Sequence, residues 1–344
     1  MPELPEVETI ARGLRPQLTG RCITGVDVRW HGSIAGDRGA VEALVGRRIS
    51  AVGRRGKLLL LRLDDAAAIP DACTGQMVAV PGGGADTSAP LGMPVQPVQP
   101  AQTVQPDMSG QPDMPDQWVA HALCSPHVAA LPAHLDPNRV ALVGVHLKMT
   151  GRLFVYPPAQ PPGVHTRVIV ALDDGNRLFF DDARKFGYLR ALTPAMLARW
   201  DFWTGLGPEP LTLPMRAFVA LLAGRRARIK SLLLDQTIIA GVGNIYADES
   251  LFRAQIRPDR QAATLGDTQL AALHGHLQDV LQESIAECGS SVRDYRDAHG
   301  DAGAFQNRFR VYGRSGQRCI VCDAPLETAT VAGRTSVFCP CCQK

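Results

Sequence analysis

Several features are scarce in this 344-residue chain, and each scarcity excludes a class of protein. Aromatic residues make up only 6% of the chain. No apolar run approaches the roughly 20 residues needed to cross a bilayer, so we expect no contact with membranes. The N-terminus, MPELPE, is acidic where a secretory signal peptide is basic and then apolar, which predicts a cytosolic protein. A hydrophobic content of 45% still supports two globular domains with cores of their own.

Lysine is also scarce, with five residues against 31 arginines. Of the two side chains, only the amine of lysine readily gives up its proton near neutral pH. This draws attention to Lys57, Lys148, Lys185 and Lys230. For any one of them, a lysine exposed to solvent is the default interpretation. The formal net charge of +3 is unevenly distributed, because residues 66–139 contain six Asp, one Arg and neither Glu nor Lys. The rest of the chain is therefore distinctly basic. This favours an anionic partner such as nucleic acid, although base usage alone explains an arginine-rich composition equally well.

The segment at residues 66–139 differs in amino-acid composition from the sequence on either side of it. It contains three consecutive glycines and a proline/glutamine run from Pro94 to Pro100. Such a composition buries too little apolar surface to offset the entropy lost on ordering, so we predict a disordered insertion. The strands on either side of it are expected to be neighbours.

Periodicity predicts one helix and then many strands in the first 205 residues. Apolar residues at positions 7, 10, 11, 14 and 18 form a helical stripe that follows an acidic first turn. Strand patterns follow at residues 22–30, 49–52, 57–63, 140–147, 153–156, 167–172 and 177–180. Short strands between Gly and Asp turns predict an antiparallel sandwich or barrel. Helical patterns occupy residues 214–222, 229–239, 245–253 and 268–287, before short strands return at the end.

Two Cys-x-x-Cys pairs lie near the C-terminus, Cys319 with Cys322 and Cys339 with Cys342, and sixteen residues separate the pairs. Each pair supplies two thiolates from a tight turn, which suits tetrahedral coordination of one structural zinc ion with no open position. Cysteines in an intracellular chain also favour metal binding over disulfides. Cys341 is adjacent to the last ligand and competes with it for the fourth position.

The N-terminus offers an unusual amine. Removal of Met1 exposes the secondary amine of Pro2, directly followed by the carboxylate of Glu3. An α-amino group has a reference pKa of about 7.7 to 8.0 against about 10.4 for lysine, so more of it is neutral and nucleophilic in the cell. Taken alone, a proline that only starts a helix explains the same residues.

A glycine turn, Gly241–Asn244, joins two helical patterns. Its glycines permit a close approach of the backbone to a ligand, and the free amides that follow, with Asn244, suit a phosphate. Taken alone, an ordinary corner between two helices is the better explanation of the turn.

Together these motifs resemble the bacterial formamidopyrimidine-DNA glycosylase family over nearly the whole chain outside the insertion. The matching motifs are residues 2–8 (PELPEVE), 54–57 (RRGK), 146–153 (HLKMTGRL), 182–187 (DARKFG), 206–211 (LGPEPL), 241–249 (GVGNIYADE), 311–314 (VYGR) and the four paired cysteines. The resemblance implies an α+β fold, with an N-terminal antiparallel β-sandwich and flanking helices, a helix-two-turn-helix domain and a C-terminal zinc-finger β-hairpin. We expect these at residues 2–205 (insertion included), 214–307 and 308–344, with a linker at 206–213.

The resemblance also implies an activity. It predicts a bifunctional DNA glycosylase and AP lyase of base excision repair, which removes 8-oxoguanine and formamidopyrimidines from damaged double-stranded DNA and cleaves the strand by β,δ-elimination. We expect a monomer in the bacterial cytosol, associated with the nucleoid through DNA binding.

Site residues follow from the same match. Pro2 would form a Schiff base at C1′ of an everted nucleotide, with Glu3 as the acid/base, and Lys57 and Arg334 match proton donors for β- and δ-elimination. In this family, three side chains fill the space that the everted base leaves in the duplex. The matching residues here are Met149, Arg184 and Phe186. Phosphate contacts are implied for His165, Arg184, Arg225, Lys230 and Asn244.

Some positions depart from the family pattern. Lys148 stands where many members have glycine, Arg225 replaces a lysine, and only His165 matches a Lys-His-Asp-His run. Cys288–Ser291 departs from the usual Gly-Gly-Thr-Thr of the loop over the everted base, so the sequence does not give the lesion preference.

Two other functions compete with this interpretation. An endonuclease VIII-like glycosylase for oxidised pyrimidines uses the same amine chemistry, but the PELPEVE start and the complete intercalating trio disfavour it. A non-catalytic zinc-ribbon DNA-binding protein explains the cysteines and the charge but leaves Pro2, Glu3, Lys57 and Arg334 without a role.

Overall fold

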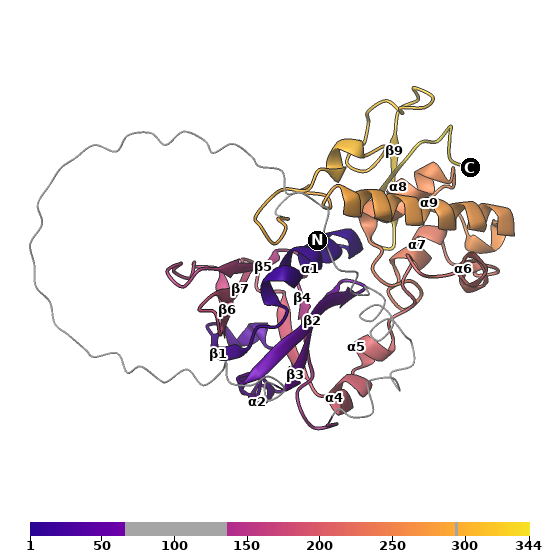
Figure 1. Cartoon of the computed structure of the whole chain (residues 1–344). Helices are drawn as coiled ribbons and strands as arrows, with labels where there is room; N and C mark the ends of the chain where they lie inside the picture. The colour runs from indigo at the N-terminus through magenta and orange to yellow at the C-terminus, as the bar shows by residue number, and fades with distance from the viewer. Residues whose placement is uncertain (66–135, 293–294) are drawn as a thin grey trace, which may run out of the picture.

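The computed structural model describes residues 1–65, 136–292 and 295–344 (Figure 1). The insertion predicted to be disordered lies outside the described residues except at 136–139. The N-terminal elements are α1 (Leu4–Leu18), β1 (Ile23–Val28), α2 (Gly39–Glu42), β2 (Arg47–Arg55), β3 (Leu58–Asp65), β4 (Leu142–His146), β5 (Gly151–Tyr156), β6 (Thr166–Leu172), β7 (Arg177–Asp182), β8 (Tyr188–Leu192), α4 (Pro194–Ala198) and α5 (Asp201–Thr204). The C-terminal elements are α6 (Met215–Leu222), α7 (Ile229–Leu234), α8 (Asn244–Arg253), α9 (Asp267–Ala286), β9 (Glu327–Val331) and β10 (Arg334–Phe338).

The N-terminal part is a sandwich of two antiparallel sheets. One has the strand order β2-β3-β4-β8 and the other β1-β6-β7-β5. Strands β3 and β4 flank the insertion and pair directly, with Leu58 opposite His146, so the prediction that they are neighbours is confirmed. Inward-facing aliphatic residues of both sheets form one hydrophobic core, as in other β-sandwiches.

Helix α1 covers the edge of this sandwich and touches the helical part. Its apolar stripe, Val7, Ile10, Ala11, Leu14 and Leu18, is at most 1% exposed and belongs to the sandwich core. Leu4, at the start of the same helix, belongs instead to the core of the helical part. The beginning of the chain therefore lies at the boundary between the two parts (Figure 1).

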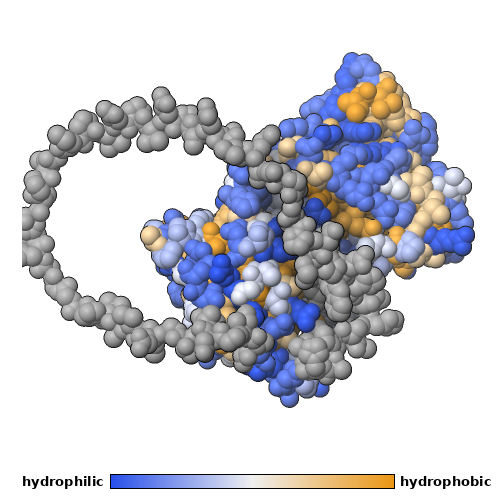
Figure 2. Space-filling model, viewed as in Figure 1, coloured by the Kyte–Doolittle hydropathy of each residue, from blue (hydrophilic) through white to orange (hydrophobic). Residues whose placement is uncertain are grey.

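The second core is formed by helices α6 to α9 around Phe218, Tyr246 and Leu277, all fully buried. The β9–β10 hairpin packs on α8 through a small cluster that includes Phe252 and Val337. Most of the face of this C-terminal part seen in Figure 2 is hydrophilic. Among the described residues, no helix combines the length and apolarity needed to span a bilayer.

The structure departs from three sequence predictions. The described part of the first 205 residues contains four α-helices rather than one, because α2, α4 and α5 have only four or five residues each and are too short to show an apolar period. Strand β8 was not predicted, because its five residues are too few to show a clear strand pattern. It is stabilised by antiparallel pairing with β4 at the edge of the sheet. The helix expected over 229–239 ends at Leu234. There the Asp235 carboxylate accepts a 2.9 Å hydrogen bond from the Thr237 amide, a local turn that competes with the helix.

Candidate active site

A cavity of about 960 Å³ lies where α1, the β2–β3 turn, the start of α8 and the β9–β10 hairpin meet. Its lining includes seven of the residues that the sequence singled out: Pro2, Glu3, Lys57, Met149, Arg184, Asn244 and Arg334. These come from both ends of the chain and from both structural parts. Met1 also lines the cavity and is 51% exposed, so the chain begins at this opening.

Glu3 is buried at the contact between two helix N-termini. One carboxylate oxygen accepts a 3.2 Å hydrogen bond from the backbone amide of Ile245, in the first turn of α8, where the helix dipole favours negative charge. The other oxygen, Oε2, is buried without a hydrogen-bond partner among the described residues. Burial raises the pKa of Glu3 to about 7, even though Lys57 opposes this. The carboxyl group can therefore take up and release a proton near neutral pH.

Lys57 enters the cavity from the turn between β2 and β3. Its side chain is only 8% exposed, and burial lowers the pKa of its ammonium despite the nearby carboxylates of Glu3 and Glu6. Arg334, at the start of β10, is exposed, also lines the cavity and acts to lower the pKa of Lys57. A lysine with a lowered pKa is suited to proton transfer, whereas an arginine stays charged.

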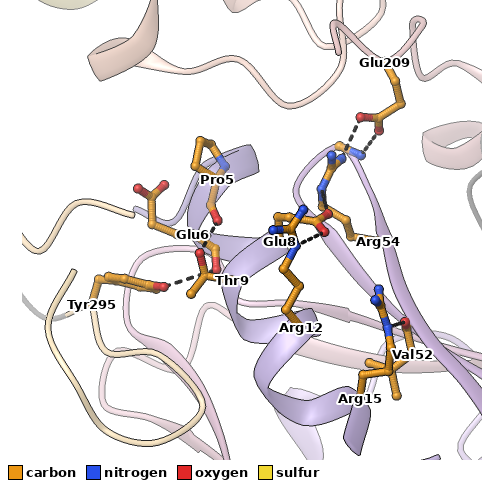
Figure 3. A network of polar contacts seen from close by, with 11 residues as sticks. Pro5, Glu6, Glu8, Thr9, Arg12, Arg15, Val52, Arg54, Glu209 and Tyr295 are labelled. Carbon is orange, nitrogen blue, oxygen red and sulfur yellow. Dashed lines mark hydrogen bonds and ion pairs between the residues drawn. The ribbon is translucent and has the colours of Figure 1, made fainter. Parts of the chain in front are cut away.

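The turn that carries Lys57 is held by the segment that links the two parts. Arg54 bridges Glu8 of α1 at 2.8 Å and Glu209 of the linker at 2.6 Å (Figure 3). The other oxygen of Glu209 accepts a hydrogen bond from the Gly56 amide. Gly56 has a φ of +56°, and a Cβ there would lie 3.3 Å from Ala240, so both the turn and its close packing favour glycine.

A buried polar network behind Glu3 was missed by the sequence analysis. Glu6 accepts hydrogen bonds from the Tyr246 hydroxyl and from the Ser290 amide, the latter at 2.8 Å, and from the Glu3 amide at 2.8 Å. Tyr246 also contacts the Ser284 hydroxyl at 2.7 Å. The network joins α1, α8 and the loop after α9. Both Glu6 and Tyr246 lie within the quoted motifs, but only the fold shows that they meet.

Three residues at the rim of the cavity are assembled as one group. The Arg184 guanidinium lies 3.0 Å from the Met149 sulfur and 4.9 Å from the Phe186 ring centroid. Met149 and Phe186 are 38% and 55% exposed, unusual for such apolar side chains. Asp182, fully buried, accepts a hydrogen bond from Thr150 and so joins the two loops that carry the group.

The residues expected to contact phosphate differ in their surroundings. His165 and Arg225 are exposed, and the Asn244 amide donates a 3.0 Å hydrogen bond to the Thr335 carbonyl. Lys230 is fully buried, and its ammonium contacts Asp248 at 2.6 Å and Ser336 at 2.7 Å. In this structure Lys230 ties α7 and α8 to the hairpin, and its contact with phosphate stays a prediction.

The four paired cysteines converge at the end of the hairpin. The sulfur atoms of Cys319, Cys322, Cys339 and Cys342 all lie within 4.8 Å of one another. Thiolates at about 2.3 Å from a central zinc ion are separated by comparable distances, so the group fits tetrahedral coordination. The cluster does not include Cys341, which is exposed.

Three family models cover most of the chain. The formamidopyrimidine-DNA glycosylase N-terminal domain matches residues 1–117 and 130–189, the formamidopyrimidine-DNA glycosylase H2TH domain matches 206–296, and the zinc finger found in FPG and IleRS matches 316–344. The chain is 53% identical to a formamidopyrimidine-DNA glycosylase of Nitratidesulfovibrio vulgaris and 37% identical to one of Chloroflexus aurantiacus. These alignments cover all of this chain, and 100% and 98% of the two relatives.

Solved structures agree with the sequence relatives. The MutM (Fpg) protein of Thermus thermophilus is 32% identical with a TM-score of 0.70, over 99% of this chain and 98% of that one. The complex of Lactococcus lactis Fpg with N7-benzyl-Fapy-dG containing DNA matches over 100% of both chains, at 25% identity and a TM-score of 0.72. The chain belongs to the formamidopyrimidine-DNA glycosylase family, with the predicted α+β fold and one structural zinc site.

Proposed function

We propose that this protein is a bifunctional DNA glycosylase and AP lyase that removes oxidised purines from damaged double-stranded DNA. The observation that carries the proposal is the meeting of Pro2, Glu3 and Lys57 in one cavity, with Arg334 on its wall. The group formed by Met149, Arg184 and Phe186 stands at the rim, where it would enter the space that an everted nucleotide leaves. The relatives named as formamidopyrimidine-DNA glycosylases support the same activity.

The reaction begins at the amine of Pro2 after Met1 is removed. The nitrogen lone pair forms a bond to C1′, the bond from C1′ to the base breaks, and the base leaves with a proton. Opening of the sugar ring then gives a cationic Schiff base, and the ring oxygen takes up a proton. Loss of a proton from C2′ breaks the C3′–O bond and expels the 3′ phosphate. Loss of a proton from C4′ then breaks the C5′–O bond and expels the 5′ phosphate. Water finally hydrolyses the C1′=N bond, which releases the sugar fragment as an aldehyde and returns the Pro2 amine.

Glu3 and Lys57 are suited to these proton transfers. Because the pKa of Glu3 is about 7, the protonated carboxyl can donate to the opening ring and the carboxylate can later accept. The lowered pKa of Lys57 allows its ammonium to deliver a proton to a leaving group and to recover it afterwards. The resemblance implies that Arg334 is the donor in the second elimination. Because a guanidinium keeps its charge, we propose that it acts by a hydrogen bond to the departing phosphate.

The test is product analysis on defined duplexes. We expect 8-oxoguanine opposite cytosine to be excised and the strand to be cut with phosphate on both new ends. A matched set with thymine glycol and dihydrouracil tests the pyrimidine alternative, which is supported if those bases are removed in preference. Tight binding without excision or cleavage of any of these duplexes would support a non-catalytic DNA-binding protein.

We further propose that the protein acts as a monomer in the bacterial cytosol, where it would associate with the nucleoid through DNA binding. Light scattering at micromolar concentration tests the monomer, and a fluorescent C-terminal fusion tests association with the nucleoid. The boundaries at 2–205, 206–213, 214–307 and 308–344 stay predictions, and limited proteolysis checks them.

A further inference from the structure

An exposed tryptophan outside the cavity contacts the loop that carries Arg184 and Phe186. The Lys185 ammonium lies 3.9 Å from the ring centroid of Trp30, at a distance typical of a cation–π contact. Trp30 follows β1, immediately before the short helical turn His31–Ser33, and is 42% exposed. Neither Trp30 nor Lys185 lines the cavity.

Trp30 is firmly attached to the sandwich. The amides of Arg29 and Trp30 donate hydrogen bonds to the Arg167 carbonyl at 2.9 and 3.1 Å. The indole lies against Gly32, where an added Cβ would be 2.5 Å from the indole nitrogen. Arg167 in turn donates a 2.8 Å hydrogen bond to the carbonyl of Asp182, the last residue before the loop. Arg167 is therefore linked to the start of the loop through Asp182 and to Lys185 through Trp30.

The loop conformation separates neighbouring side chains. Lys185 has a φ of +59°, in the left-handed region that is unfavourable for a residue with a Cβ. Arg184 and Phe186 contact one another, and Arg184 contacts Met149, whereas Lys185 between them contacts Trp30. The contact with the indole offsets part of the unfavourable backbone conformation.

We propose that Trp30 is a positioning residue for the distortion of DNA. Its ring holds Lys185, so that Arg184 and Phe186 are arranged for insertion before the duplex arrives, and less ordering is needed on binding. The proposal rests on the proposed function, because it concerns the step in which those two residues enter the duplex. A cation–π contact at an exposed site corresponds to about two- to five-fold in an equilibrium constant, so its loss should weaken insertion by that factor.

A double-mutant cycle tests this pairing. Wild type, Trp30→Ala, Lys185→Met and the double variant are titrated with an uncleavable duplex that carries a tetrahydrofuran abasic analogue and 2-aminopurine beside the opposite base. Affinity reports binding, and 2-aminopurine fluorescence reports unstacking. We expect each single variant to lose about two- to five-fold in affinity and the double variant to lose no more than the worse single variant. Trp30→Phe and Lys185→Arg should recover most of the loss, because ring and cation are kept.

Additive losses would overturn the proposal, since they would mean that Trp30 and Lys185 contact DNA independently. Unchanged affinity and fluorescence in both single variants would overturn it as well. Met215→Ala, which removes a 47% exposed apolar side chain elsewhere, is the matched control and should behave as wild type. Excision of 8-oxoguanine by wild type is measured separately. Its failure would contradict the proposed function, whereas the cycle on the abasic duplex decides the role of Trp30.

Discussion

The Glu3 carboxyl group fills the space that Gly243 leaves by having no side chain. A Cβ at residue 243 would lie 2.3 Å from the Glu3 carboxyl carbon and 2.4 Å from its Oε1. The same carboxylate accepts a hydrogen bond from Ile245, so it cannot retreat without losing that bond. The glycine before α8 is therefore part of what positions the proposed acid/base.

Gly243→Ala should slow excision by roughly 100-fold while leaving the sandwich folded. The methyl group displaces Glu3 from the α8 amides, and misplacement by about 1 Å costs roughly 100-fold in rate. Single-turnover excision on 8-oxoguanine duplex measures the loss. The control is Gly275→Ala in α9, where nothing lies within 4 Å, and which should keep its rate and gain about 0.5–1 kcal/mol of stability. A Gly243→Ala enzyme with the wild-type rate would refute the positioning role.

The pH dependence of excision should follow Glu3 and the Pro2 amine. With a pKa of about 7, the protonated carboxyl of Glu3 is lost as pH rises through 7. The neutral fraction of the Pro2 amine, whose reference pKa is about 7.7 to 8.0, is lost as pH falls. The single-turnover rate should therefore pass through a maximum between about pH 7 and 8 and fall on both sides. Glu3→Gln cannot exchange the proton, and its rate should drop by about 10²- to 10⁴-fold at every pH. A wild-type profile that is flat between pH 6 and 8 would contradict this assignment.

Stability should respond to the same group with a definite sign. The folded-state pKa of about 7 lies above the reference value of 4.5, so the native state binds the proton more tightly. The free energy of unfolding therefore falls as pH rises from 4.5 through 7. Glu3→Gln should unfold like wild type near pH 4 and be more stable near pH 8, by up to about 3 kcal/mol. Denaturant titrations at both pH values measure it, and lower stability of the variant at pH 8 would count against the raised pKa.

The Arg54–Glu209 pair should matter for both stability and strand cleavage. The Arg54 and Glu209 side chains are 8% and 4% exposed, so Glu209→Ala leaves a buried guanidinium short of one partner and the Gly56 amide unpaired. We expect a loss of about 3–5 kcal/mol and slower β-elimination, since the turn that carries Lys57 loses its attachment. Arg308→Ala, from an exposed pair with Glu287, should change stability by less than about 0.5 kcal/mol. Equal losses in the free energy of unfolding for Glu209→Ala and Arg308→Ala would contradict this role of the Arg54–Glu209 pair.

Removal of zinc should disable DNA binding before it unfolds the sandwich. The finger cluster contacts α8 through Phe252 but shares no residue with the sandwich core. A strong chelator, or Cys339→Ala, should release one zinc ion per chain and displace Arg334, which lies on β10, the strand that ends directly before Cys339. A colorimetric zinc assay and duplex titration follow this, and Cys341→Ala is the control that should retain zinc. Loss of zinc in Cys341→Ala would reassign the fourth ligand.

Local patterns predicted the parts of the structure whose signal lies in a few adjacent residues. Such parts are the apolar stripe of α1 and the zinc cysteines. In both, the spacing along the sequence determines which side chains lie on the same side of the element. Contacts across long sequence separations were not predictable, including Arg54 with Glu209 and Glu6 with Tyr246. Lys230 shows why: the family resemblance implies a phosphate contact for it, but its burial against Asp248 depends on the packing of α7 against α8.

The measurement that tests the central claim most directly is the identity of the residue that captures the sugar. The protein is incubated with 8-oxoguanine duplex and borohydride, and the covalent complex is digested and sequenced by mass spectrometry. We predict that the crosslinked peptide begins with Pro2 and carries the sugar on its terminal nitrogen, and that a variant retaining Met1 gives no adduct. A crosslink at Lys57 or any other residue, or an undiminished adduct with Met1 retained, would contradict the account.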